Sequence, residues 1–201
     1  MKNRSIFIFT TFIVLLTINK ISLHRDIKRQ SRDLSAVNIS GRQRMFSQKI
    51  LKLALLLKEN TTKQNTLKNS AKLKAITENF KKLQQELKEN YLTKYDDFYL
   101  KGLYKELEPF YLAIVTNSNL LTSNNINKKE IISCFLEISK ASDHFLRIMD
   151  KIVNQHELIG KNRGKLILRR EFTFNVIIGC LSIYGIFFVV VPMFHLINQT
   201  K

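Results

Sequence analysis

Two uncharged apolar runs near the ends of this 201-residue sequence limit the folds available to it. Residues 173–191 contain no charged side chain and are long enough to cross a bilayer as a helix. Residues 5–18 are also uncharged but short for a span, and Ile21 and Leu23 extend them past Lys20, whose long side chain can reach the membrane surface. A cleaved signal peptide is the alternative for this first run. The sequence that follows the run has no small-residue cleavage site, which favours an uncleaved anchor.

The sequence between the two runs predicts an all-α domain. Apolar residues recur three and four positions apart, which is the period of a helix with a buried face. The chain has only six Gly and two Pro, as expected for long helices with few tight turns. We therefore expect an antiparallel four-helix bundle bracketed by two transmembrane helices. The expected parts are an N-terminal anchor at 1–23, the bundle at 24–171, a second membrane helix at 172–197 and a short cytoplasmic tail at 198–201.

The apolar period also predicts where the helices of the bundle lie. The first helix continues from the anchor through residues 35–57, and the polar stretch 58–70 is expected to form a loop. A third helix is expected at 98–121 with Pro109 as a kink, and a fourth helix begins near Lys128 and runs into the second membrane segment. The apolar positions that define the second helix are Leu73, Ile76, Phe80, Leu83 and Leu87.

Residues 35–57 carry two apolar seams, although a surface helix of a monomer needs only one. The first, which we call the core seam, consists of Ile39, Gln43, Phe46, Ile50, Leu53 and Leu57. The second, which we call the outer seam, lies on nearly the opposite side and consists of Leu34, Val37, Gly41, Arg44, Gln48, Leu51 and Leu55. Two seams predict that this helix packs in its own bundle on one side and meets a second body on the other.

Arg44 in the outer seam has two interpretations. Its stem can pack along the seam while its guanidinium reaches water. Alternatively, the outer seam is a homodimer interface on a two-fold axis, and Arg44 faces its own copy. Two unit charges about 5 Å apart, at an effective dielectric of roughly 20, repel by roughly 3 kcal/mol. An anion between them would replace this repulsion with two charge-assisted contacts, and a site of this kind suits a sensor.

Residues 38–49, Asn-Ile-Ser-Gly-Arg-Gln-Arg-Met-Phe-Ser-Gln-Lys, resemble the signature of PilJ-type sensor domains, the N-terminal region of type IV pili methyl-accepting chemotaxis transducers. These domains are similar to the nitrate-sensing region of NarX/NarQ-type histidine kinases. Residues 145–157 also resemble the last sensor helix of the family, and the segment around Pro192 resembles its exit from the membrane. The resemblance implies a multi-pass protein of the bacterial inner membrane whose bundle lies outside the cytoplasm.

The resemblance also implies a ligand-binding site. Arg44 is the residue expected to hold a small anion, with nitrate as the candidate, at the interface of a homodimer. Gly41 would allow the two helices to approach closely, and Arg42 and Lys49 would add positive field. Lys49 stands where the family has an arginine, so the charge is kept and the bidentate geometry is lost. Asn38 completes the expected ligand-binding set.

The sequence contains no pattern that predicts catalysis, a metal site or a cofactor. The four histidines are scattered, the two cysteines lie on unrelated stretches, and there is no glycine-rich phosphate loop or nucleophile elbow. We therefore expect a protein that is not an enzyme. Family members usually pass their signal to an appended module, and the sequence after Pro192 is too short for one. We expect the output to come from a separate receptor, kinase or chemotaxis protein.

The net charge of +17 leaves two further interpretations open. Basic residues border both apolar runs on the bundle side, which by the positive-inside rule favours a cytoplasmic bundle. Long domains translocate largely regardless of charge, so we follow the resemblance. The alternatives are a basic membrane-tethered module that binds anionic lipid or nucleic acid, and a truncated receptor that dampens full-length relatives. The absence of a groove-reading motif disfavours nucleic acid, whereas the basic residues beside the spans favour contacts with membrane lipids.

Overall fold

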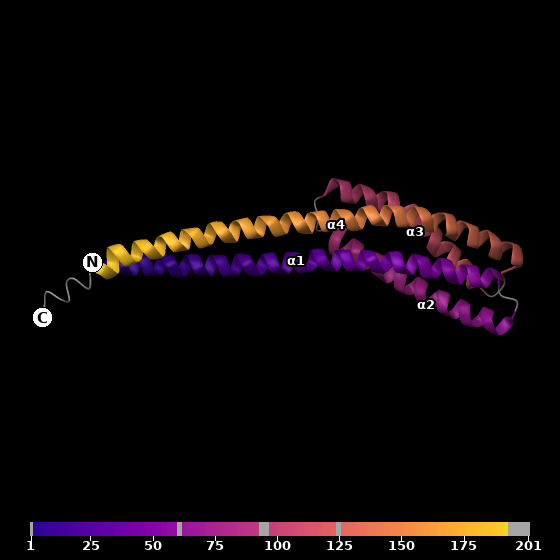
Figure 1. The fold of residues 1–201 in the computed structure, drawn as a ribbon. Coiled ribbons are helices and arrows are strands. Elements are labelled where there is room, and N and C mark those ends of the chain that lie inside the picture. The colour runs from indigo at the N-terminus through magenta and orange to yellow at the C-terminus, as the bar shows by residue number, and fades with distance from the viewer. Residues whose placement is uncertain (1, 60–61, 93–96, 124–125, 193–201) are drawn as a thin grey trace. The chain divides into compact units, whose positions relative to one another are not determined.

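The computed structural model describes residues 2–59, 62–92, 97–123 and 126–192. Every regular element within these ranges is a helix, which confirms the all-α prediction (Figure 1). The elements in chain order are α1 (Lys2–Glu59), α2 (Lys63–Leu87), the π-helical turn η1 (Lys88–Leu92), α3 (Phe98–Leu121), α4 (Lys128–Gly185) and the π-helical turn η2 (Ile186–Val190). The expected tail at 198–201 lies outside the described residues.

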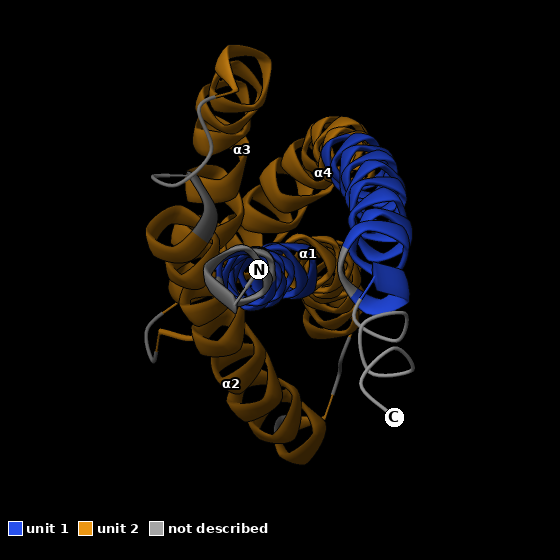
Figure 2. Cartoon of the chain, turned by 90° about the vertical axis from the view of Figure 1, so that its left-hand side faces the viewer, with its two compact units in different colours: residues 1–32, 159–201 blue, residues 33–158 orange. Residues whose placement is uncertain are grey.

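The chain divides into two compact units, which Figure 2 distinguishes by colour. Residues 33–158 form one unit, which we call the core unit. It holds the C-terminal part of α1, all of α2 and α3, and the first part of α4. Residues 1–32 and 159–201 form the other, which we call the terminal unit. The domain boundaries expected from the sequence remain predictions.

The apolar period predicts most helices correctly. α3 spans Phe98–Leu121, as predicted, and contains Pro109. α4 begins at Lys128, as predicted, and continues as one helix of 58 residues into the apolar C-terminal segment. α1 is likewise continuous from the N-terminal apolar run through the signature, because no Pro or paired Gly interrupts it.

The loop predicted at residues 58–70 is wrong for residues 58–59 and 63–70, which are helical, and residues 60–61 lie outside the described part of the chain. α1 extends to Glu59 and α2 already begins at Lys63. The Asn and Thr residues of this stretch suggest a loop, but its Lys, Gln and Leu residues are good helix formers. Most side chains in the first turns of α2 are exposed, so their polarity carries no desolvation cost there.

All four helices contribute side chains to the core of the core unit. Phe80 of α2 is fully buried, and its ring centroid lies 5.3 Å from those of Tyr111 on α3 and Phe145 on α4. Tilted aromatic pairs of this kind add to the free energy gained from burial alone. The core seam of α1 is buried as predicted, with Phe46 half-buried at its edge.

Within the described residues, the helix Lys128–Phe188 is the one that is long and apolar enough to cross a membrane, and its apolar window is not buried. Its length and composition agree with the predicted second membrane helix. The N-terminal anchor and the two-span topology remain predictions. In the terminal unit, the buried carboxylate of Asp26 forms an ion pair with Arg170, and the rings of Tyr184 and Phe188 stack with centroids 4.6 Å apart.

Candidate ligand-binding site

The signature residues 38–49 lie on α1 within the core unit and divide between a buried and an exposed side. The buried members are Ile39, Ser40, Gln43 and Ser47. The exposed members include four of the five residues predicted to bind the ligand, which are Asn38, Arg42, Arg44 and Lys49. The fifth, Gly41, is half-buried.

Arg44 forms an ion pair with Asp150 of α4. The Nε atom of Arg44 lies 2.8 Å from Oδ1 of Asp150, and the two side chains are 44% and 50% exposed. Pairs as exposed as this stabilise a protein by about 0.2–1 kcal/mol, because water screens them and long side chains must be ordered. Arg44 is therefore accessible to a solute but is already next to a carboxylate.

The other predicted residues do not all share the face of Arg44. At 3.6 residues per turn, Gly41 lies about 60° around α1 from Arg44, whereas Asn38, Arg42 and Lys49 lie about 120–160° away. The Nζ atom of Lys49 lies 5.9 Å from the ring centroid of Phe46. This cation–π contact is on the side of α1 that faces away from Arg44. Within one chain, the structure therefore does not gather the five residues around a single point.

The space that a side chain at Gly41 would enter is open. A Cβ atom added at this position would have nothing within 4 Å. The fold of one chain therefore does not require glycine here. Gly41 lies with Arg44 in the outer seam, so the role predicted for this glycine concerns contact with a second chain. Of that seam, Leu34, Arg44 and Gln48 are exposed and the remaining members are half-buried.

Gln43 in the middle of the signature has a structural role that its sequence pattern only partly indicates. Its Nε2 donates to the main-chain oxygen of Phe80 at 3.0 Å and to Oε1 of Gln84 at 3.4 Å, both on α2. Both glutamines are buried. Buried amides are normally hydrogen-bonded because leaving them without a partner is costly. This contact joins α1 to α2, and the membership of Gln43 in the core seam predicts its burial but not its partners.

A second buried polar contact joins α3 to α4. The Tyr104 hydroxyl lies 3.2 Å from Nε2 of His156, and both residues are buried. Burial lowers the pKa of His156 to about 4, while the nearby carboxylates of Asp33 and Asp97 act in the opposite direction. From the sequence the four histidines are only scattered residues, and the burial of His156 against Tyr104 is not predicted. Its place four residues after Ile152 and eight after Ile148, both buried, is the signal that could have found it.

The described part of the chain contains no cluster of three His, Cys, Asp or Glu side chains that could hold a metal ion. Cys134 and Cys180 are both free thiols. Burial raises the pKa of the Cys134 thiol, with Glu130 adding to the effect, which makes this thiol a poorer nucleophile.

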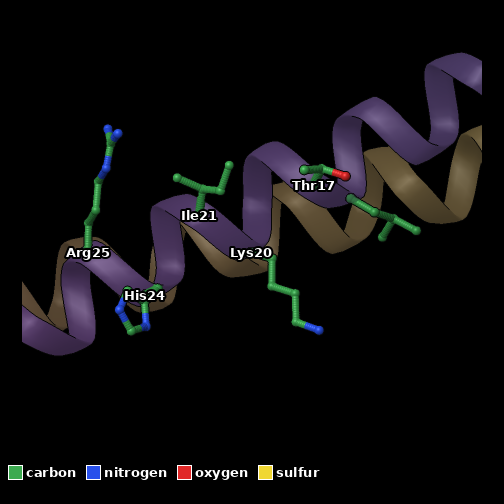
Figure 3. A pocket seen from close by; sticks show the side chains of 6 residues that line it. Thr17, Lys20, Ile21, His24 and Arg25 are labelled. Carbon is green, nitrogen blue, oxygen red and sulfur yellow. The ribbon is translucent and has the colours of Figure 1, made fainter.

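The terminal unit has an open groove along α1, where the apolar run meets basic residues (Figure 3). Figure 3 shows Lys20 and His24 extending from one side of α1 and Ile21 and Arg25 from the other. The groove is lined by Leu16, Thr17, Lys20, Ile21, His24 and Arg25. Its lining is mostly apolar and includes the basic side chains of Lys20 and Arg25.

Comparison with protein families identifies the segment that holds the signature. Residues 27–100 match PilJ. The family is described as the N-terminal region of type IV pili methyl-accepting chemotaxis transducers. No curated protein and no solved structure matches the chain. The PilJ match suggests a sensor and signal-transduction role for the matched segment.

The PilJ match divides the contacts described above. It includes Arg44, Gln43 and Gln84, so the signature and its buried link to α2 both lie inside it. It ends before Asp150 and His156 on α4. The partner of the exposed arginine therefore comes from a part of the chain outside the PilJ match.

Proposed function

We propose that this chain is the sensing part of a membrane-anchored receptor that binds a small anion at Arg44 and passes a signal to a separate output protein. The observation that carries the proposal is the PilJ match over the segment that holds Arg44, together with the exposed position of that guanidinium. The net charge of +17 favours an anionic ligand, because it raises the local concentration of anions.

The contacts within the core unit support an antiparallel bundle. Arg44 pairs with Asp150, whereas Lys58, later in α1, lies with its Nζ 4.5 Å from the ring centroid of Phe135, which is earlier in α4. The pairs between α3 and α4 follow the same order. Tyr104 meets His156, and Phe110, which is later in α3, stacks on His144, which is earlier in α4, with ring centroids 4.7 Å apart.

We propose that the site is completed by a second copy of the chain, in the manner of NarX/NarQ-type nitrate sensors. Arg44 and Gly41 lie on the same side of α1, so a two-fold axis near them would bring two guanidinium groups together. Nitrate is planar and carries one negative charge, which suits the planar donor fork of arginine. Arg42 and Lys49 lie farther around the helix and contribute through their longer-range positive field, whereas Asn38, which also lies farther around, is uncharged and contributes none.

The test is the response of the full chain in detergent to anions. At constant ionic strength, nitrate, chloride and sulfate are compared by the melting temperature they produce. We expect one of them to raise it in the wild type, Arg44→Lys to weaken the response, and Arg44→Ala to abolish it without unfolding the protein. Arg147→Ala, which removes an exposed arginine of α4, is the charge-matched control. An Arg44→Ala variant that keeps the full response would disprove the site.

The proposed location is a bacterial inner membrane, with the core unit outside the cytoplasm and both ends of the chain inside. Reporter fusions at the exposed Leu67 and at the C-terminal Lys201 test this arrangement. A reporter active in the cytoplasm at Leu67 would contradict it.

Detergent extraction of native membranes followed by pull-down tests the separate output protein, and recovery of this chain alone would favour a dampening role.

The groove in Figure 3 favours a second candidate function, the binding of anionic lipid headgroups. Lys20 and Arg25 lie where the apolar run ends, and each basic residue near an anionic membrane surface contributes about 1 kcal/mol. The experiment places the chain in nanodiscs that contain both phosphatidylglycerol and phosphatidylcholine. Exchange of Lys20 and Arg25 for Gln should lower the amount of phosphatidylglycerol retained relative to phosphatidylcholine. Unchanged lipid retention would remove this candidate.

A further inference from the structure

We infer that Asp150 sets the anion affinity of Arg44 by competing with the ligand for the same guanidinium group. The inference rests on the proposed anion site and adds a residue that lies outside both the signature and the PilJ match. Its starting point is the 2.8 Å contact between Nε of Arg44 and Oδ1 of Asp150.

The chemistry of the two competitors is alike. A carboxylate and a nitrate ion are both planar, carry a single negative charge and offer neighbouring oxygen atoms to an arginine fork. Asp150 occupies the edge of the guanidinium that carries Nε. An anion that binds this edge must displace Asp150, and one that binds the remaining nitrogens sits close to a negative charge. In both cases Asp150 weakens binding.

The exposure of the pair makes the exchange feasible. The side chains of Arg44 and Asp150 are 44% and 50% exposed. Because neither group is sealed in the core, separating them leaves no buried charge without a partner, and water hydrates the freed carboxylate. Ion pairs of this exposure are weak. We therefore expect removal of the Asp150 charge to tighten anion binding by about twofold to fivefold.

The exchange also gives the ligand a way to favour one state over another. Asp150 belongs to α4, which continues without a break to Gly185 in the apolar segment. An anion that displaces Asp150 from Arg44 removes a contact between the signature helix and α4. A ligand changes a conformational equilibrium only when it interacts differently with the two states, and the loss of this contact is such a difference.

The experiment measures the dissociation constant of nitrate by titration calorimetry on the full chain in detergent, at constant ionic strength. Asp150→Asn should bind nitrate about twofold to fivefold more tightly than the wild type. Asp143→Asn is the matched control, because Asp143 is an exposed acid of the same helix about two turns earlier, so the change in net charge is identical. Its dissociation constant should stay within about 1.5-fold of the wild type.

Asp150→Ser removes the same charge and takes the place of Asp150→Asn in every comparison if that variant folds poorly. Asp150→Glu retains the charge and should keep the weaker affinity of the wild type. Wild-type binding of nitrate with no tightening in Asp150→Asn would overturn the role of Asp150 and leave the anion site standing. Equal tightening in Asp150→Glu and Asp150→Asn would also overturn it. Failure of the wild type and of all variants to bind nitrate, chloride or sulfate would instead disprove the proposed function, and the role of Asp150 with it.

Discussion

The hydroxyl of Tyr104 and Nε2 of His156 lie 3.2 Å apart between α3 and α4, in a place where these residues are only 2% and 1% exposed. A histidine in such a place loses the hydration that would stabilise its charged form. Burial therefore lowers its pKa to about 4, even though Asp33 and Asp97 favour the charged form. The folded protein holds His156 neutral near pH 7.

The low pKa of His156 predicts a loss of stability in acid. The unfolded chain binds a proton at His156 near pH 6.5, whereas the folded chain binds it only near pH 4. The contribution of His156 to stability is therefore complete above pH 6.5 and falls as the pH drops toward 4, by up to about 3 kcal/mol. Denaturation of the full chain in detergent between pH 4 and 8 measures this. His156→Gln, which keeps a polar group near Tyr104, should lose less stability over the same range, and an identical loss would contradict the assignment.

Gln43 and Gln84 predict a strongly non-additive pair of substitutions. Their contact leaves Oε1 of Gln43 and Nε2 of Gln84 buried without a hydrogen-bond partner in the described structure. Gln43→Met removes the remaining partner of the Gln84 side chain, so we expect a loss of about 1–3 kcal/mol. Adding Gln84→Met replaces both polar groups with apolar ones of similar size, and the double variant should regain most of that loss. Chemical denaturation measures both values. Additive losses would show that the amide pair does not act as a unit.

Gly41 and Gly102 separate the fold of one chain from the proposed dimer. A Cβ atom at either position meets nothing within 4 Å. Because alanine is a better helix former, Gly102→Ala should stabilise the chain by about 1 kcal/mol. Gly41→Ala should give the same gain in the helix but weaken dimerisation by about 1 kcal/mol or more, since added methyl groups push closely packed helices apart. Sedimentation in detergent measures the dimer. Equal behaviour of the two variants would place Gly41 outside any interface.

Cross-linking tests the two seams of α1 directly. In a background with Cys134 and Cys180 replaced by alanine, single cysteines at Val37 and Gln48 of the outer seam should link two chains. Cysteines at Phe46 and Leu53 of the core seam should link poorly, because these positions are half-buried and buried within one chain. Comparable yields from both sets would remove the argument for a dimer through the outer seam.

Helix position could be predicted from the sequence wherever an apolar face is buried. Leu103, Leu107 and Ile114 of α3 are buried at the predicted spacing. The stretch 58–70 could not be predicted in the same way, because its exposed side chains follow no apolar period. There, local polarity suggests a loop, while intrinsic helix propensity favours the helical structure of residues 58–59 and 63–70.

The candidate site shows a different limit. A helix period gives the face on which a residue lies. The burial of Gln43 therefore follows from the sequence, and so does the wide angle around α1 that separates Arg42 from Arg44. It does not give the partner on another helix. The pairing of Arg44 with Asp150 depends on how α1 and α4 align, and no pattern within either segment encodes that alignment.

Asp97 uses one carboxylate for two contacts. Its Oδ1 accepts the amide of Leu100 at 2.8 Å, and its Oδ2 accepts Nε2 of Gln155 on α4 at 2.8 Å. Amides in the first turn of a helix have no acceptor within the helix and normally exchange their hydrogen with solvent soon after the end frays. The Leu100 amide is instead held by a side chain that α4 keeps in place. Its hydrogen exchange should therefore follow the separation of α3 from α4, which makes this single amide a reporter of interhelical opening in the native protein.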